Sequence, residues 1–432
     1  MMTKRNFIAG LLLLVFVLTA GCAAKPPQPA ATPAAETTPA ATPSPAPTPE
    51  PTPTPDPIAE AVAAMTTEQK VGQLLVAGIA GVQPGEDGAA AIQDYQVGSI
   101  ILFGRNVESA EQLAQLNNGL KALNGDYIPL FLAVDQEGGR VDRMPAEVEN
   151  LPPALEFGSI PDTDSRLDTC FELGRTLAAQ CAAFGFNLDF APDMDVWSNP
   201  DNTVIGDRAF GTDAGTVTGA ANMAALGLLS QGVIPVAKHF PGHGDTAVDS
   251  HYGLPVVDKT LEELETLELR PFRQAIDTTC VYGTYGDAAI PAVMVAHILM
   301  TQLDPDWPAS LSHKVVTGLL REELGFDGVV CTDDLTMGAL AQTWGVGEAA
   351  VLAVEAGCDL LLVCHELDNL TAARSALLEA VDTGRISMER LDESVYRILS
   401  LKLEYGLTND PVSAPNVAAL NAQIDALKAR LG

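Results

Sequence analysis

The chain alternates between short apolar runs and longer segments with helical periodicity. Several runs are apolar on both alternating positions and are bounded by Gly, Pro, Asp or Lys, which is typical of strands buried on both faces. Eight such runs lie at 73–79, 98–103, 129–134, 187–191, 234–237, 292–296, 328–332 and 359–364. Between them, apolar residues recur every three or four positions, as on one face of a helix. The clearest helical segments are 109–123, 165–184, 213–231, 260–276 and 313–324.

Strands that alternate with helices in this way predict an α/β fold, a (β/α)8 barrel of the TIM type that forms a single catalytic domain. Polar residues come directly after several of the predicted strands. They are Asp135, the 201–208 loop, Lys238 with His239, His297 and Asp333. Enzymes with this fold build their active sites from the loops at the carboxyl ends of the strands. The pattern therefore predicts an active site at that end of the barrel.

The first residues have the pattern of a targeting segment. Two basic residues precede an apolar run at 7–18, which is too short to span a membrane and is typical of a signal peptide. Residues 18–22, Leu-Thr-Ala-Gly-Cys, resemble a bacterial lipobox, in which Cys22 is lipidated and becomes the mature N-terminus. Residues 1–22 are thus expected to be a lipoprotein signal peptide, and a secretory signal cut elsewhere is the alternative.

Residues 23–57 are dominated by Pro, Ala and Thr and have no apolar period, so they predict an extended tether. At ~3 Å per residue its reach is at most on the order of 100 Å. The catalytic domain is expected at 58–410 and a helical tail at 411–432. We expect a monomeric, extracytoplasmic lipoprotein of the bacterial cell membrane, held there by its lipid anchor.

Charge and cysteine content narrow the choice of partners. The net charge of −32 argues against nucleic acid and against adsorption to anionic lipid. Apart from Cys22, the cysteines are dispersed and form no CxxC motif, so we expect buried free thiols rather than disulfides.

Residues 238–251, Lys-His-Phe-Pro-Gly-His-Gly-Asp-Thr-Ala-Val-Asp-Ser-His, hold three of the 6 histidines. The Pro-Gly-His-Gly core excludes a helix, so His239 and His243 cannot be two metal ligands on one helical face. No cysteine is near to complete a zinc site, and we expect no metal here. Charged groups crowded after a buried strand must pair, bind a ligand or react. The segment predicts a functional loop.

This segment resembles the signature of glycoside hydrolase family 3, in particular its β-N-acetylglucosaminidase branch. Three other segments resemble the same family, in the family's order: Ala-Val-Asp-Gln-Glu-Gly-Gly-Arg-Val-Asp-Arg at 133–143, Val-Ile-Gly-Asp-Arg-Ala-Phe-Gly at 204–211 and Cys-Thr-Asp-Asp-Leu-Thr-Met at 331–337. The resemblance implies a retaining exo-β-N-acetylglucosaminidase that needs no cofactor and no metal. It would remove terminal GlcNAc from peptidoglycan fragments (muropeptides) or related glycans through a covalent glycosyl-aspartate.

Retention needs a carboxylate nucleophile and a proton donor about 5 Å apart. Asp333 and Asp334 are both candidates for the nucleophile. Neighbouring strand residues point to opposite faces, so only one of them can face the site, and periodicity does not choose between them. The resemblance assigns Asp333, while Asp334 fits a helix N-cap before 335–340. The resemblance also assigns the proton donor to His251, with Asp249 beside it to fix its tautomer and stabilise its charge.

Substrate binding falls, by the same resemblance, to Asp135, Arg143, Arg208, Lys238 and His239. Carboxylates and fixed cations suit sugar hydroxyls, which both donate and accept hydrogen bonds. The sequence does not decide whether four other residues bind the substrate or support the structure: Glu137, Arg140, His243 and His297.

Three alternatives remain. A β-glucosidase of the same family typically takes an acid from a second domain, which we do not expect here, and lacks the Asp-Ser-His loop. A phosphorylase could use the same residues, because a neutral histidine does not repel phosphate. A non-catalytic wall-binding lipoprotein on a degenerate barrel would have lost its nucleophile or acid, yet Asp333, Asp249 and His251 are all present.

Overall fold

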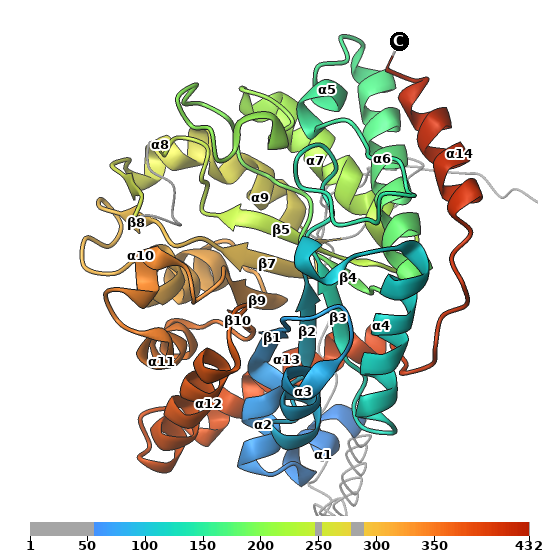
Figure 1. Cartoon of the computed structure of the whole chain (residues 1–432). Helices are drawn as coiled ribbons and strands as arrows, with labels where there is room; N and C mark the ends of the chain where they lie inside the picture. The colour runs from blue at the N-terminus through green and yellow to red at the C-terminus, as the bar shows by residue number, and fades with distance from the viewer. Residues whose placement is uncertain (1–55, 247–252, 278–288, 432) are drawn as a thin grey trace, which may run out of the picture. The chain divides into compact units, whose positions relative to one another are not determined.

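The computed structural model describes residues 56–246, 253–277 and 289–431. Eight parallel strands form a barrel at its centre (Figure 1). They are β1 (Leu75–Gly78), β2 (Ser99–Leu102), β3 (Phe131–Val134), β4 (Leu188–Asp189), β5 (Ile234–Phe240), β7 (Ala292–Val295), β9 (Val329–Thr332) and β10 (Leu361–Val363). Each predicted strand corresponds to one of these, and the predicted (β/α)8 barrel is confirmed.

The hydrogen-bonded order is β10-β1-β2-β3-β4-β5-β7-β9, and every neighbouring pair is parallel. A parallel bridge between Cys331 and Leu360 joins β9 to the segment entering β10 and brings the two outer strands together. Strands β2, β3, β5, β7, β9 and β10 are buried at every position. These strands are mostly apolar because helices cover the outside of the barrel and side chains fill its inside. Lys238 and His239, at the carboxyl end of β5, are exceptions.

The helices surround the barrel (Figure 1). They are α1 (Pro57–Ala64), α2 (Thr67–Leu74), α3 (Gly85–Ala89), α4 (Ala110–Asn124), α5 (Ala154–Gly158), α6 (Thr163–Phe184), α7 (Ala214–Leu229), α8 (Leu261–Thr266), α9 (Leu269–Ile276), α10 (Gly338–Ala341), α11 (Val346–Ala356), α12 (Leu367–Asp382), α13 (Met388–Glu404) and α14 (Val417–Lys428). Several begin at a side-chain cap that the sequence shows. Ser109, Asp162 and Asp213 each accept a hydrogen bond from the backbone N–H three residues on. Such caps satisfy backbone donors that have no partner inside the helix.

Two predicted helices differ in detail. The segment at 260–276 is two helices, since α8 ends at Thr266 and α9 starts at Leu269. Pro271 has no N–H to donate to the Leu267 carbonyl one turn earlier, so a continuous α-helix would lose a hydrogen bond there. The segment at 313–324 contains a π-helix, Lys314–Glu323, in place of an α-helix.

Near the end of the chain, α14 packs along α6 and buries Leu420, Ile424 and Leu427 (Figure 1). A second, two-stranded parallel sheet pairs β6 (Val256–Val257) with β8 (Leu299–Met300). The cysteines in the described ranges are all buried and free, as expected: Cys170, Cys181, Cys331, Cys358 and Cys364. Among the helices described, none combines the length and the apolar character needed to cross a bilayer. The predicted signal peptide, Cys22 and nearly all of the tether lie outside the described residues.

Candidate active site

A cavity of about 460 Å³ lies at the carboxyl ends of the strands. Six of the predicted site residues line it: Asp135, Arg143, Arg208, Lys238, His239 and Asp333. The predicted acid His251 and its neighbour Asp249 lie outside the described residues. The cavity is also lined by Glu137 and His243, whose roles the sequence left open, and by residues that it did not indicate, among them Phe103 and His365.

Lys238 and Arg208 share the carboxylate of Glu137. The Lys238 Nζ lies 2.7 Å from Asp135 Oδ1 and 2.6 Å from Glu137 Oε1. Arg208 donates to both oxygens of Glu137, from Nε at 2.9 Å and from Nη2 at 2.8 Å. Burial alone would raise the pKa of Glu137, but the two cations hold that pKa well below its usual range. Glu137 and the two cations are therefore charged, and together with Asp135 they form a fixed array at the cavity wall.

The two arginines of the 133–143 motif have different roles. Arg140 donates to the carbonyl oxygens of Thr203, Val204 and Ile205 at 2.6, 2.6 and 2.7 Å. It thus clamps the loop that leads to Arg208, which is a structural role. Arg143 lines the cavity, and its buried Nε has no hydrogen-bond partner within the part of the chain described. Its guanidinium keeps donors for a ligand.

Asp333 and Asp334 both line the cavity, but their carboxylates differ in how they are used. Asp334 Oδ1 accepts from the N–H groups of Thr336 and Cys364 at 3.0 and 3.1 Å, and Oδ2 accepts from the Thr336 hydroxyl at 2.6 Å. The expected N-cap role of Asp334 is wrong in detail, because α10 starts later, with Met337 at its N-cap position. Asp334 instead holds the turn after β9.

Asp333 is the carboxylate available for chemistry. Its Oδ1 accepts the Asp334 N–H at 2.8 Å, and no donor from the described residues reaches its Oδ2. Burial alone would raise the pKa of Asp333, but His297, His239, the Asp334 N–H and Lys238 together hold the pKa below its usual value. Asp333 is therefore ionised at neutral pH, as a nucleophile must be.

His297 supports the turn that follows β9. Its Nε2 lies 3.1 Å from the Asp334 carbonyl, to which it donates, and its Nδ1 lies 2.7 Å from the Ser310 hydroxyl. The ring is fully buried, and burial lowers its pKa, so it is neutral. His297 is thus a structural residue that supports the turn containing Asp333 and Asp334.

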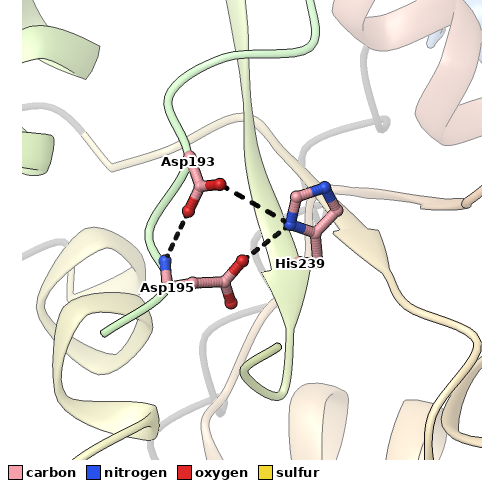
Figure 2. A group of neighbouring side chains, drawn as sticks. All are labelled: Asp193, Asp195 and His239. Atoms are coloured by element: carbon pink, nitrogen blue, oxygen red, sulfur yellow. Dashed lines mark hydrogen bonds and ion pairs between the residues drawn. The ribbon is translucent and has the colours of Figure 1, made fainter. Parts of the chain in front are cut away.

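His239 lies beside two buried carboxylates that the motifs do not single out, Asp193 and Asp195 (Figure 2). The His239 Nδ1 is 2.7 Å from Asp195 Oδ2 and 4.0 Å from Asp193 Oδ2. The Asp195 N–H donates to Asp193 Oδ1 at 2.8 Å. Both carboxylates follow β4, so the strand-end rule that indicates Asp135 and Asp333 also applies to them.

Asp193, Asp195 and His239 together offer the ligand atoms of a cation site. The hydrogen-bond pattern does not fit one. The Arg208 Nη2 lies 3.3 Å from His239 Nε2, and a guanidinium only donates, so Nε2 must accept. The ring proton is then on Nδ1, where it donates to Asp195 and leaves no lone pair for a metal. Burial, followed by the charge of Arg208, lowers the pKa of His239 to about 4, so the ring is neutral.

The sequence of residues 66–401 matches the family described as Glycosyl hydrolase family 3 N terminal domain. The chain belongs to this family of glycoside hydrolases. A β-hexosaminidase of Nitrosomonas eutropha is 35% identical over 332 residues, which are 76% of this chain and 91% of that protein. The β-hexosaminidase LpqI of Mycobacterium tuberculosis is 36% identical over 349 residues, 79% of this chain and 84% of that protein.

Solved structures agree with this placement. A family 3 β-N-acetylglucosaminidase from Paenibacillus sp. str. FPU-7 has 40% sequence identity and a TM-score of 0.76, and the match covers 85% of this chain and 69% of that chain. A β-glucoside phosphorylase, BglX, has a TM-score of 0.74 but only 24% identity, so it shows the shared fold alone.

Proposed function

We propose that the chain is an exo-acting β-N-acetylhexosaminidase that releases terminal GlcNAc from peptidoglycan fragments or related glycans with retention of configuration. The observation that carries the proposal is the Asp333 carboxylate, ionised and open to a cavity walled by fixed cations and carboxylates. The β-hexosaminidase relatives support the choice of sugar.

The first chemical step forms a glycosyl-enzyme. Asp333 attacks the anomeric carbon, and the electron pair of the glycosidic bond passes to the leaving oxygen, which takes a proton from the His251 imidazolium. In the second step, neutral His251 removes a proton from water, the water oxygen bonds to the anomeric carbon, and the Asp333 carboxylate leaves. Asp249 stabilises the imidazolium. The roles of His251 and Asp249 rest on the sequence motif.

Substrate binding rests on the charged array. Asp135 and Glu137 accept hydrogen bonds from sugar hydroxyls, while Lys238, Arg208 and Arg143 donate to them. Because the carboxylates and cations already hold one another in place, little side-chain ordering is needed when the sugar binds.

One assay separates this function from its rivals. Turnover of aryl β-GlcNAc and aryl β-glucoside is measured with and without phosphate, and the released sugar is identified. We expect free GlcNAc from the first substrate at a rate that phosphate does not change. GlcNAc 1-phosphate as the product would make the enzyme a phosphorylase, preference for the glucoside would make it a β-glucosidase, and no turnover would favour a binding protein.

We also propose that the protein is an extracytoplasmic lipoprotein of the bacterial cell membrane. The support is the lipobox-like segment ending at Cys22 and the Pro-rich composition that follows it. Growth with an alkyne-labelled fatty acid should label the full-length protein and not Cys22→Ala. Equal labelling of both proteins would contradict the anchor.

A further inference from the structure

Asp195 is a buried carboxylate that accepts two hydrogen bonds from the segment after Lys238. Its Oδ2 accepts from His239 Nδ1 at 2.7 Å, and its Oδ1 accepts from the His243 N–H at 2.6 Å. The residue is fully buried and does not line the cavity. Figure 2 shows its carboxylate directed at the imidazole of His239. Among the described residues, the carboxylate of Asp195 is therefore linked to the site by hydrogen bonds through these two histidines.

The other edge of the His239 ring faces the cavity. His239 and Arg208 both line it, and Nε2 lies 3.3 Å from the Arg208 Nη2. A neutral imidazole has one donor and one acceptor nitrogen, and Arg208 can only donate. The two neighbours thus demand the same tautomer: Asp195 needs the proton on Nδ1, and Arg208 needs a lone pair on Nε2.

We propose that Asp195 is a positioning residue that holds His239 in its Nδ1–H tautomer, so that Nε2 accepts from Arg208 and fixes that guanidinium at the cavity wall. This deepens the proposed function, on which it rests, because it explains how Arg208 is held for binding of the sugar. Lys238 and Arg208 supply the donors that line the cavity here.

The carboxylate is needed because both of its partners are donors. In Asp195→Asn, either orientation of the amide turns its NH₂ group toward the His239 ring or toward the His243 N–H. The first orientation reverses the tautomer and places Nε2–H against the Arg208 N–H. The second removes the acceptor of a buried backbone N–H, which costs stability.

The tautomer can be observed directly. The full-length chain, labelled with ¹⁵N-histidine, has only 6 histidines, and His239→Gln assigns the signal of interest. Long-range ¹H–¹⁵N spectra at pH 7 should show His239 protonated on Nδ1 alone. In Asp195→Asn we expect the Nε2–H form to appear and KM for aryl β-GlcNAc to rise about 10- to 100-fold, the effect of losing a hydrogen bond to a charged group, with a smaller change in kcat.

Two control variants separate this role from general damage. Asp193→Asn keeps an oxygen for the Asp195 N–H, so the His239 tautomer should not change. Asp304→Asn alters a buried carboxylate that accepts from Ser312 and lies outside the cavity lining, and KM should stay at the wild-type value.

The spectrum of the wild-type protein tests the proposal even if Asp195→Asn does not fold. His239 protonated on Nε2, protonated on both nitrogens, or bound to a metal that chelator removes would each overturn the proposal. An Asp195→Asn protein with unchanged tautomer and unchanged KM would overturn it as well. A wild-type enzyme that does not turn over β-GlcNAc would instead refute the proposed function, while the tautomer result would stand.

Discussion

The backbone N–H of Asp334 donates to the carboxylate of Asp333 at 2.8 Å, so two adjacent acids share one turn with only one of them free to react. The carboxylate of Asp334 accepts hydrogen bonds from Thr336 and Cys364. The pair thus divides catalysis and support between neighbouring residues. Paired substitutions can separate the two roles.

Asp333→Asn should reduce kcat by several orders of magnitude, because a covalent catalyst is removed. A fluorinated glycoside should label the peptide that contains Asp333 in the wild type. Asp334→Asn should keep the label on Asp333, but lower Tm, because the amide opposes one of the donors that the carboxylate accepts. Label on Asp334 or on another residue would contradict the assignment of the nucleophile.

His251→Ala should stop cleavage of natural β-GlcNAc linkages but spare the first step with activated aryl glycosides, since a phenolate of low pKa leaves without protonation. The second step would still lack its base, so a burst and accumulated glycosyl-enzyme should appear in rapid-quench kinetics. Asp249→Asn should show a milder form of the same behaviour. Equal slowing of good and poor leaving groups, without a burst, would mean that His251 binds or supports and is not the acid.

A protein without the tether should keep full kcat on a small aryl glycoside. Asp56 caps α1, accepting from the Ile58 and Ala59 N–H groups, and it also accepts from the Tyr396 hydroxyl. A chain that begins at Pro55 should therefore be slightly more stable than one that begins at Pro57, because the second chain has lost the cap. Thermal unfolding and kcat of both proteins test this, and a large loss of kcat would mean that the tether contributes to the site.

Lys402 should make the folded state more stable as pH rises above neutral. Its buried Nζ donates to the Gln73 side chain and the Gly98 carbonyl, each at 2.9 Å, and burial lowers its pKa from 10.5 to about 7. Between these two pKa values the unfolded chain binds more protons than the folded one, so the free energy of unfolding increases with pH.

Denaturant unfolding of the wild type and of Lys402→Met between pH 7 and 10 tests this relationship. The difference in unfolding free energy between the two proteins should move in favour of the wild type as pH rises. A difference that is constant with pH would show that Lys402 stays protonated in the folded state, held by its two acceptors and by the Phe131 ring at 4.8 Å.

The barrel, and the end of it at which the site lies, could both be predicted from the amino-acid sequence. A strand buried on both faces has to be apolar along its whole length, and that requirement is visible locally in each of the predicted runs. The polar residues that follow, such as Asp135, Lys238 and Asp333, are then placed at one rim by the fold. Their roles in binding and catalysis came from the family resemblance.

Only the tertiary structure separated Arg140 from Arg143 and Asp333 from Asp334, and only it joined Asp195 to His239. The two arginines look alike in the sequence, and so do the two aspartates, because neighbouring polar residues of the same type carry no mark of their partners. Several of the deciding partners lie tens of residues away, as Thr203 does from Arg140, Cys364 from Asp334 and His239 from Asp195, and they are selected at hydrogen-bond distances. Those distances depend on the register of β4, β5 and β9 around the barrel, which local apolar pattern does not encode.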